Sequence, residues 1–167
     1  MLTDSAKAAG LPAPFEWRGQ TYQVNPPDLN AEIRFSALLE ARDAEGVRRS
    51  RAALGEQGYQ DALQQHRDDL AAGEYEWGGR VFARALRSDG GLREMAFLCL
   101  TKAHPDFSRE QMHALFRDRA PRADAEGNPL PSKWDELIVL LYDLMATPKN
   151  GPGAAPQAPA PSSAPPT

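Results

Sequence analysis

The chain has 167 residues, 41% of them hydrophobic and 25% charged, which is enough for one ordinary domain but not for two large ones. Its formal net charge of −4 argues against a general binder of nucleic acid or anionic membranes, because such proteins need an excess of lysine and arginine. The single cysteine, Cys99, excludes an internal disulfide bond and is typical of a reducing compartment.

The N-terminal region is predicted to be a flexible arm over residues 1–14, followed by a short β-hairpin or β-arm over residues 15–24. Arg18-Gly19 can form the turn between the two strands. The aromatic residues that favour strand here are Phe15, Trp17 and Tyr22. A lone hairpin is marginal in water, so we expect this aromatic face to pack on helices or on a partner.

Two helices are predicted next, over about residues 28–54 and 59–72, with Gly46 marking a kink or a break in the first. The apolar residues expected to share one face of the first helix are Leu29, Ile33, Ala37, Ala44, Val47 and Leu54. His66 lies on the apolar stripe of the second helix, where a hydrogen-bonded structural histidine is expected. Gly73 follows as a left-handed residue that ends this helix.

A sequence echo links residues 75–82 to residues 15–22, since both read aromatic-Glu-Trp-x-Gly-x-x-aromatic. Either the echo is chance, or the two segments are related β-turn elements that frame one side of the domain. A short helix over about residues 80–88 is predicted to overlap the second copy.

Three helices complete the predicted domain. Residues 92–103 form an almost entirely apolar rod that neighbours must cover. Ser108 and Gln111 make a capping box at the start of a helix over about 109–119. A loop of about a dozen residues then leads to the last helix, over about 133–146.

The predicted fold class is therefore mainly α: a small bundle of about five to six helices with a short N-terminal β-hairpin or β-arm. The helical domain is expected to span residues 15–147. Residues 148–167 are rich in proline and alanine and are predicted to form a disordered tail, because they cannot bury enough apolar area to offset the entropy of ordering.

No catalytic, metal-binding or cofactor-binding residues are predicted. The three histidines and Cys99 are too few and too scattered for a metal site. Cys99 lies inside the apolar rod rather than in an exposed electropositive pocket, which disfavours a nucleophile. The chain has neither a nucleotide-binding glycine pattern nor a nucleophile elbow, so we expect no enzymatic activity and no cofactor.

A basic patch on the first long helix is a weak candidate for nucleic-acid binding. Its residues are Arg42, Arg48, Arg49 and Arg51. Acidic residues interleave the patch, so a salt-bridged solvated face is the favoured interpretation.

Protein interaction is the remaining class of function, and aromatic residues near the two Trp-containing turns are its candidates. The candidate partner-binding residues are Phe15, Trp17, Tyr22, Tyr75, Trp77 and Phe82.

The order of these features resembles tail assembly chaperones of long-tailed bacteriophages over residues 15–146. The matching segments are FEWRGQTYQV at 15–24, AGEYEWGG at 72–79, the stretch 91–105 and the cap SREQ at 108–111. The resemblance implies a small helical chaperone in the host cytoplasm that coats the tape-measure protein, recruits tail-tube subunits and is absent from the finished virion. No binding residue carries over from the family.

The resemblance also implies a longer product made by a programmed ribosomal slip, for which codons 147–150 are the expected site. Two alternatives stay open: a virion structural protein of the neck or head–tail joint, and a DNA-binding regulatory module that uses Arg48, Arg49 and Arg51. We expect no membrane partner, because the chain shows neither a signal peptide nor an apolar run of about 18 residues. Self-association is left open.

Overall fold

The computed structural model describes residues 11–119 and 122–146, and it is mainly helical. The elements in chain order are β1 (Ala13–Trp17), β2 (Gln20–Val24), α2 (Leu29–Ala71), α3 (Arg80–Ala85), α4 (Asp89–Thr101), α5 (Arg109–Arg117), β3 (Arg122–Ala123), β4 (Pro129–Leu130) and α6 (Lys133–Ala146). Five helices and an N-terminal β-hairpin within the described residues confirm the predicted fold class. The predicted tail lies outside the described residues, as do residues 1–10 of the predicted arm.

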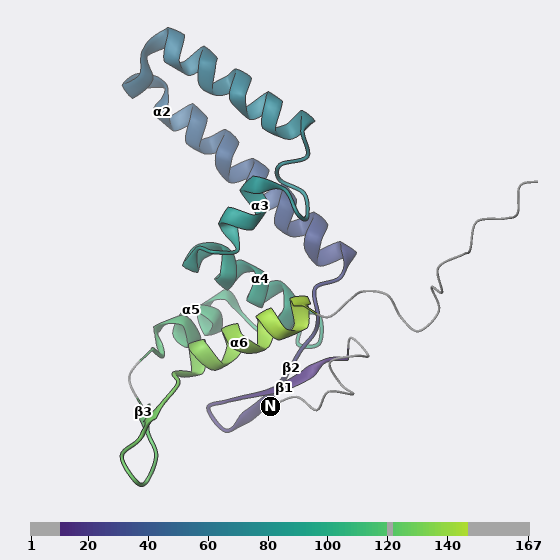
Figure 1. Cartoon of the computed structure of the whole chain (residues 1–167), viewed down its shortest axis with the longest axis vertical. Coiled ribbons are helices and arrows are strands. Elements are labelled where there is room, and N and C mark those ends of the chain that lie inside the picture. The colour runs from purple at the N-terminus through teal and green to yellow at the C-terminus, as the bar shows by residue number, and fades with distance from the viewer. Residues whose placement is uncertain (1–10, 120–121, 147–167) are drawn as a thin grey trace, which may run out of the picture.

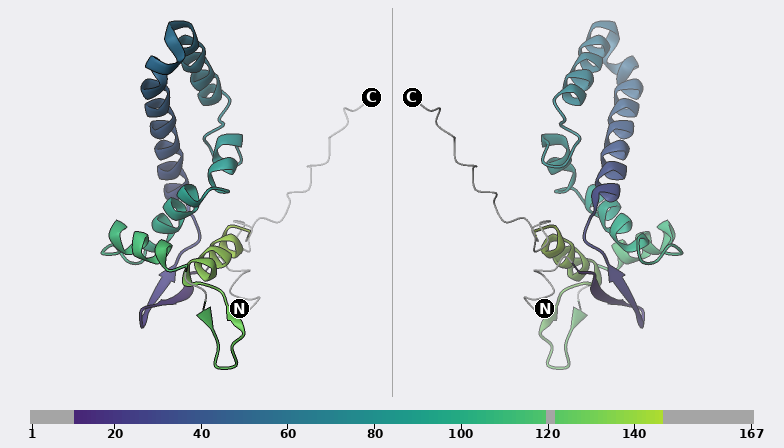
Figure 2. Two further views of the ribbon diagram at one scale, coloured as in Figure 1. Left: turned by 90° about the vertical axis from the view of Figure 1, so that its left-hand side faces the viewer. Right: turned by 90° about the vertical axis from the view of Figure 1, so that its right-hand side faces the viewer.

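The long element α2 is a helical hairpin that extends away from the remaining helices (Figure 1). Its two arms run in opposite directions, while α3 to α6 and the strand pair β1–β2 gather near the start of the first arm (Figure 2). In the part of the chain that the structure describes, no helix combines the length and the apolar composition needed to cross a membrane.

Helix α4 is the centre of the core, as the sequence predicts. It contacts α2, α3, α5, α6 and β2. Its fully buried side chains include Met95, Ala96, Cys99 and Leu100. A helix with apolar residues on every side is stable only when neighbours cover it, so the surrounding elements pack against α4.

The β-hairpin turns through two residues with positive φ, Arg18 at 52° and Gly19 at 74°. Phe15 pairs with Tyr22 and Trp17 with Gln20, which confirms the predicted hairpin. Strand β1 begins earlier than predicted, because Ala13 pairs with Val24.

The outer edge of β2 is fixed to the end of α4. The backbone N–H of Gln23 donates to Nε2 of His104 at 2.7 Å. The backbone N–H of Asn25 donates to the carbonyl oxygen of Cys99 at 3.1 Å. These bonds occupy backbone groups that an edge strand would otherwise leave open.

The predicted kink at Gly46 is wrong, because Gly46 is helical. The chain reverses at Gly55, in the gap between the helices predicted over 28–54 and 59–72. Gly55 has φ 69° and ψ 179°, a combination that almost only glycine adopts. Gly46 lies inside the first predicted helix, and propensity alone does not distinguish a tolerated helical glycine from one that kinks the helix. The predicted left-handed residue at the end of the second arm, Gly73, is confirmed with φ 69°.

The junction of α3 and α4 differs from the prediction. Helix α3 ends at Ala85, and α4 begins at Asp89, three residues earlier than expected, because Ser88 caps it by accepting from the N–H of Gly91. A Cβ on Gly91 would lie 2.0 Å from the carbonyl oxygen of Ala85, so the two helices can approach this closely only with glycine there.

The structure does not support the interpretation of the sequence echo as two related β-turn elements. Residues 15–22 form a β-hairpin, whereas residues 75–79 form turns that lead directly into α3.

Helix α5 begins with the predicted capping box of Ser108 and Gln111. Where a plain loop was expected, the two-residue strands β3 and β4 pair around a turn at Asp124.

An ion pair joins three helices around one buried carboxylate. Arg109 on α5 donates to both oxygens of Glu94 on α4, at 2.8 and 2.7 Å. Arg42 on α2 lies 3.9 Å from the same carboxylate. The hydrogen bonds from Arg109 hold the pKa of Glu94 below its usual range, against the opposing effect of burial.

The two glycines of α2 should respond in opposite directions to alanine. Gly55→Ala should lower the free energy of unfolding by about 1–3 kcal/mol, because alanine is strained at this φ and ψ. Gly46→Ala should raise it by up to about 1 kcal/mol, because the site is helical and open space surrounds the new Cβ. Urea denaturation followed by circular dichroism measures both. Equal effects would contradict the assigned break.

Glu94→Gln should lower the free energy of unfolding at pH 7 by about 1–2 kcal/mol. This is less than the loss expected for a fully buried ion pair, because Arg109 is more than half exposed and solvent screens its charge. The pKa of Glu94 is lowered by folding, so its contribution is present above about pH 4.3 and is lost as the pH falls through the folded pKa. The difference between wild type and variant should therefore narrow below about pH 4 in urea titrations. Glu110→Gln, at an exposed site of α5, is the control and should change stability by under about 0.5 kcal/mol.

Candidate functional site

The expected aromatic partner surface is wrong for five of its six residues, because the structure places them in the core. The buried residues are Phe15, Trp17, Tyr22, Tyr75 and Phe82. Tyr22 packs edge-to-face on Phe107 with ring centroids 5.3 Å apart, and Phe82 packs on Phe35 at 4.9 Å. The hairpin and the α3 turn thus use their aromatic residues to cover α4 and α2 rather than to meet a partner.

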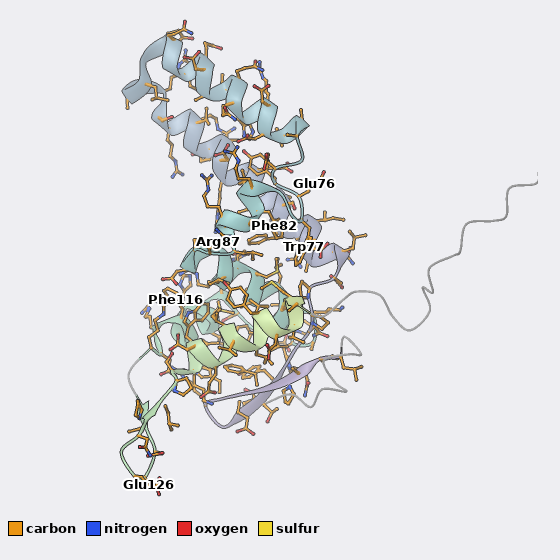
Figure 3. The ribbon with its side chains drawn as sticks, viewed as in Figure 1. Glu76, Trp77, Phe82, Arg87, Phe116 and Glu126 are labelled. Atoms are coloured by element: carbon orange, nitrogen blue, oxygen red, sulfur yellow. The ribbon has the colours of Figure 1, made fainter. Side chains whose placement is uncertain are left out.

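Trp77 is the exception, with 41% of its surface exposed. It lies with Glu76 on the turn between α2 and α3, beside the first arm of α2 (Figure 3). Its ring centroid is 5.2 Å from that of the buried Phe82. One side of Trp77 is therefore held by the core, and much of the rest of the ring faces solvent.

Trp77 forms one wall of a groove of about 390 Å³ against the first arm of α2. We call this the Trp77 groove. Its residues are Leu29, Glu32, Ile33, Ser36, Ala37, Glu40, Glu76 and Trp77. On α2 these positions follow the i, i+3, i+4, i+7 pattern of a single helical stripe.

The first arm of α2 has apolar residues on two faces. The residues that it buries toward the core are Ala31, Phe35 and Leu39. The stripe predicted from the sequence points elsewhere, since Leu29 is 69% and Ile33 58% exposed. Exposed leucine and isoleucine one turn apart line the same groove as a half-exposed tryptophan, and apolar side chains so placed suit a partner helix.

The charged residues that line the Trp77 groove are all acidic. Glu32 and Glu40 come from α2 and Glu76 from the opposite wall. The described lining includes neither lysine nor arginine. The groove therefore combines an apolar floor with a negative potential.

The candidate nucleic-acid residues are engaged with acidic side chains. Arg48 and Arg49 both donate to Glu45, at 2.9 and 2.8 Å. Arg51 donates to Glu56 at 3.1 Å. These exposed pairs match the salt-bridged face that the sequence analysis favours over a phosphate-binding patch.

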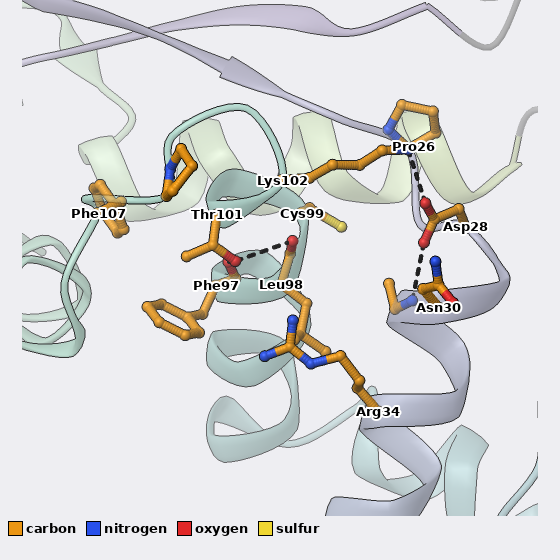
Figure 4. Close-up of a pocket in the computed structure, with 12 residues that line it drawn as sticks. Pro26, Asp28, Asn30, Arg34, Phe97, Leu98, Cys99, Thr101, Lys102 and Phe107 are labelled. Carbon is orange, nitrogen blue, oxygen red and sulfur yellow. Dashed lines mark hydrogen bonds and ion pairs between the residues drawn. The ribbon is translucent and has the colours of Figure 1, made fainter.

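A second pocket, of about 500 Å³, lies between α2 and the end of α4 (Figure 4). Its one carboxylate, Asp28, is already bonded within the protein. Asp28 accepts from the N–H of Ala31 at 2.9 Å and pairs with Lys102 at 2.8 Å. The bond from Lys102, followed by that from Ala31, lowers the pKa of Asp28.

Cys99 also lines this second pocket, but its thiol is shielded. Only 1% of the residue is exposed, and burial raises the pKa of the thiol to about 12. The sulfur therefore stays protonated at neutral pH, a state that disfavours nucleophilic attack and metal binding. Within the described residues, no group of three or more histidine, cysteine, aspartate or glutamate side chains is placed to hold a metal ion.

A hydrogen-bonded cluster of three side chains fastens the arms of the α2 hairpin to the turn before α3. The Tyr75 hydroxyl donates to Oδ2 of Asp43 at 2.6 Å, and Nδ1 of His66 lies 2.7 Å from the same oxygen. Burial, together with the bond to Asp43, raises the pKa of Tyr75. His66 thus has the expected structural role, but its partners Asp43 and Tyr75 were not predicted.

The sequence did contain a signal for the groove. Leu29 and Ile33 belong to the predicted apolar stripe, and Ala31 and Phe35 on the same helix form a second one. Two apolar stripes on one short stretch of helix exceed what a single packed face requires. Which stripe faces solvent depends on where α3 and α4 pack, and local sequence does not specify that.

Tyr75→Phe should lower the free energy of unfolding by about 1 kcal/mol, because the hydroxyl donates a partly buried hydrogen bond to Asp43. Folding raises the pKa of Tyr75, so this group stabilises the protein below its ordinary pKa of about 10 and loses that contribution as the pH rises further. Wild type should thus lose more stability than the variant above pH 10, measured by urea denaturation. Tyr142→Phe, which removes an exposed hydroxyl, should change stability at pH 7 by under about 0.5 kcal/mol.

The Trp77 groove is thus an exposed, structured surface suited to a ligand, and it is apolar with acidic groups around it. Its chemistry fits the side of a helix better than a small polar substrate. Comparisons of the chain with protein-family models, curated proteins and solved structures found no match.

Proposed function

We propose that the protein is a non-enzymatic assembly chaperone of a bacteriophage tail that acts in the host cytoplasm. In this proposal it covers apolar helical segments of the tape-measure protein until the tail forms, and a longer product recruits tail-tube subunits. The observation that carries the proposal is the Trp77 groove, which presents an apolar stripe on a helix whose other face is fixed in the core.

The dimensions of the groove suit a short helical segment. Its α2 residues run from Leu29 to Glu40, which corresponds to about 16 Å or three turns of helix. Covering the exposed parts of Leu29, Ile33 and Trp77 would stabilise a complex by roughly 1–2 kcal/mol each. Such a gain supports reversible binding, which a chaperone that leaves its partner requires.

The two alternative functions draw less support from the structure. The arginines of the DNA-binding alternative are paired with glutamates of the same α2 hairpin. A structural protein of the virion could use the same groove, so the two readings differ in whether the protein remains in the finished particle.

Co-expression with the tape-measure protein encoded in the same genome tests the proposal. We expect this protein to raise the soluble fraction of the tape-measure protein several-fold and to be absent from purified particles. Ile33→Ser should reduce the gain, because it replaces an exposed apolar residue of the groove. Val139→Ser is the matched control, because Val139 is 63% exposed on α6 and lies outside the groove.

Two results would contradict the proposal. Retention of the protein in purified particles would assign it to the virion structure. An unchanged soluble fraction of the tape-measure protein would remove the chaperone function.

A further inference from the structure

We propose that the Trp77 groove selects an amphipathic helix whose apolar stripe is flanked by lysine or arginine. This inference rests on the proposed function for the identity of the natural partner, and on the groove itself for the chemistry of that partner. The selecting groups are Glu40 and Glu76, which belong to different elements and both line the groove.

The positions of the two carboxylates set where the positive charges of the partner must lie. Glu40 follows Ile33 by seven residues, so it lies on the same stripe two turns further along α2. Glu76 precedes Trp77 on the other wall (Figure 3). A helix seated on Leu29 and Ile33 would therefore meet carboxylates at one end and along one side, where basic side chains gain charge-assisted contacts.

Charge also argues against a second copy of this chain as the occupant. A symmetric pair that used the groove on both copies would place one acidic rim against the other. Like charges brought together across an interface oppose association, and the chain as a whole carries a net charge of −4. A basic partner would instead be attracted both to the acidic rim of the groove and to the negative net charge of the chain.

Trp77 supplies the anchor for such a helix. Tryptophan at the wall of a groove is a frequent centre of binding energy, because it buries a large area with few rotatable bonds. Its contact with Phe82, which packs on Phe35, holds the ring in place before a partner arrives. The apolar contacts would provide the affinity, and the glutamates would determine which partner binds.

Two synthetic fourteen-residue amphipathic helices test the inference, one with a leucine stripe flanked by lysines and one with the same stripe flanked by glutamates. Tryptophan fluorescence is the readout, since Trp17 and Trp134 are each 2% exposed and Trp77 is 41% exposed. We expect the lysine peptide to shift the emission to shorter wavelength and to bind more weakly as salt rises. Trp77→Phe should remove the spectral shift.

Charge reversal supplies the matched variants. Glu40→Lys combined with Glu76→Lys should weaken binding of the lysine peptide about tenfold or more. Glu110→Lys combined with Glu126→Lys changes the net charge equally at exposed positions outside the groove and should weaken it by less than about threefold.

Several results would overturn the inference: equal losses in the two charge-reversal variants, equal binding of the two peptides, or a concentration-dependent dimer in sedimentation that Ile33→Ser dissociates. Full solubilisation of the tape-measure protein by the Glu40→Lys, Glu76→Lys variant would overturn it too, while the proposed function would stand. Groove-specific binding of the lysine peptide without any effect on the tape-measure protein would support the inference and remove the proposed function.

Discussion

The burial of α4 is the constraint on which the rest of this structure depends. Its apolar residues surround the helix, so α2, α3, α5, α6 and β2 must all contribute to its cover. Polar contacts then fix the covering elements in place, with Arg109 bound to Glu94 and the N–H of Asn25 bound to the carbonyl of Cys99. Because the β-hairpin and α5 are committed to α4, their aromatic residues are not available to a partner.

The α2 hairpin depends much less on the core. From residue 44 to residue 70 no side chain is buried, whereas Ala31, Phe35 and Leu39 near the start of α2 are. Few buried contacts and exposed backbone are the properties of segments that open at a lower free energy than the rest of a domain. The cluster of Asp43, His66 and Tyr75 is therefore important for holding the second arm against the first.

Local patterns predicted most of the secondary structure. The capping box at Ser108, the turn at Arg18-Gly19 and the left-handed Gly73 each depend on residues within a few positions of one another. Exposure could not be predicted in the same way: the edge of β2 is closed by His104, which lies 81 residues from its partner Gln23. The burial of the five aromatic residues and the exposure of Leu29 and Ile33 likewise depend on elements that are distant in the sequence.

The position of the Trp77 groove links these two parts of the molecule. Its stripe belongs to the portion of α2 that the core anchors, so a partner would meet a surface that is already formed. Its other wall belongs to the turn that carries Tyr75, two residues before Trp77, and Tyr75 fastens the hairpin through Asp43. A helix bound against Trp77 would restrain this turn and, through Tyr75, the second arm of α2. Binding and hairpin closure would then stabilise each other, since the free energy of coupling between two sites acts in both directions.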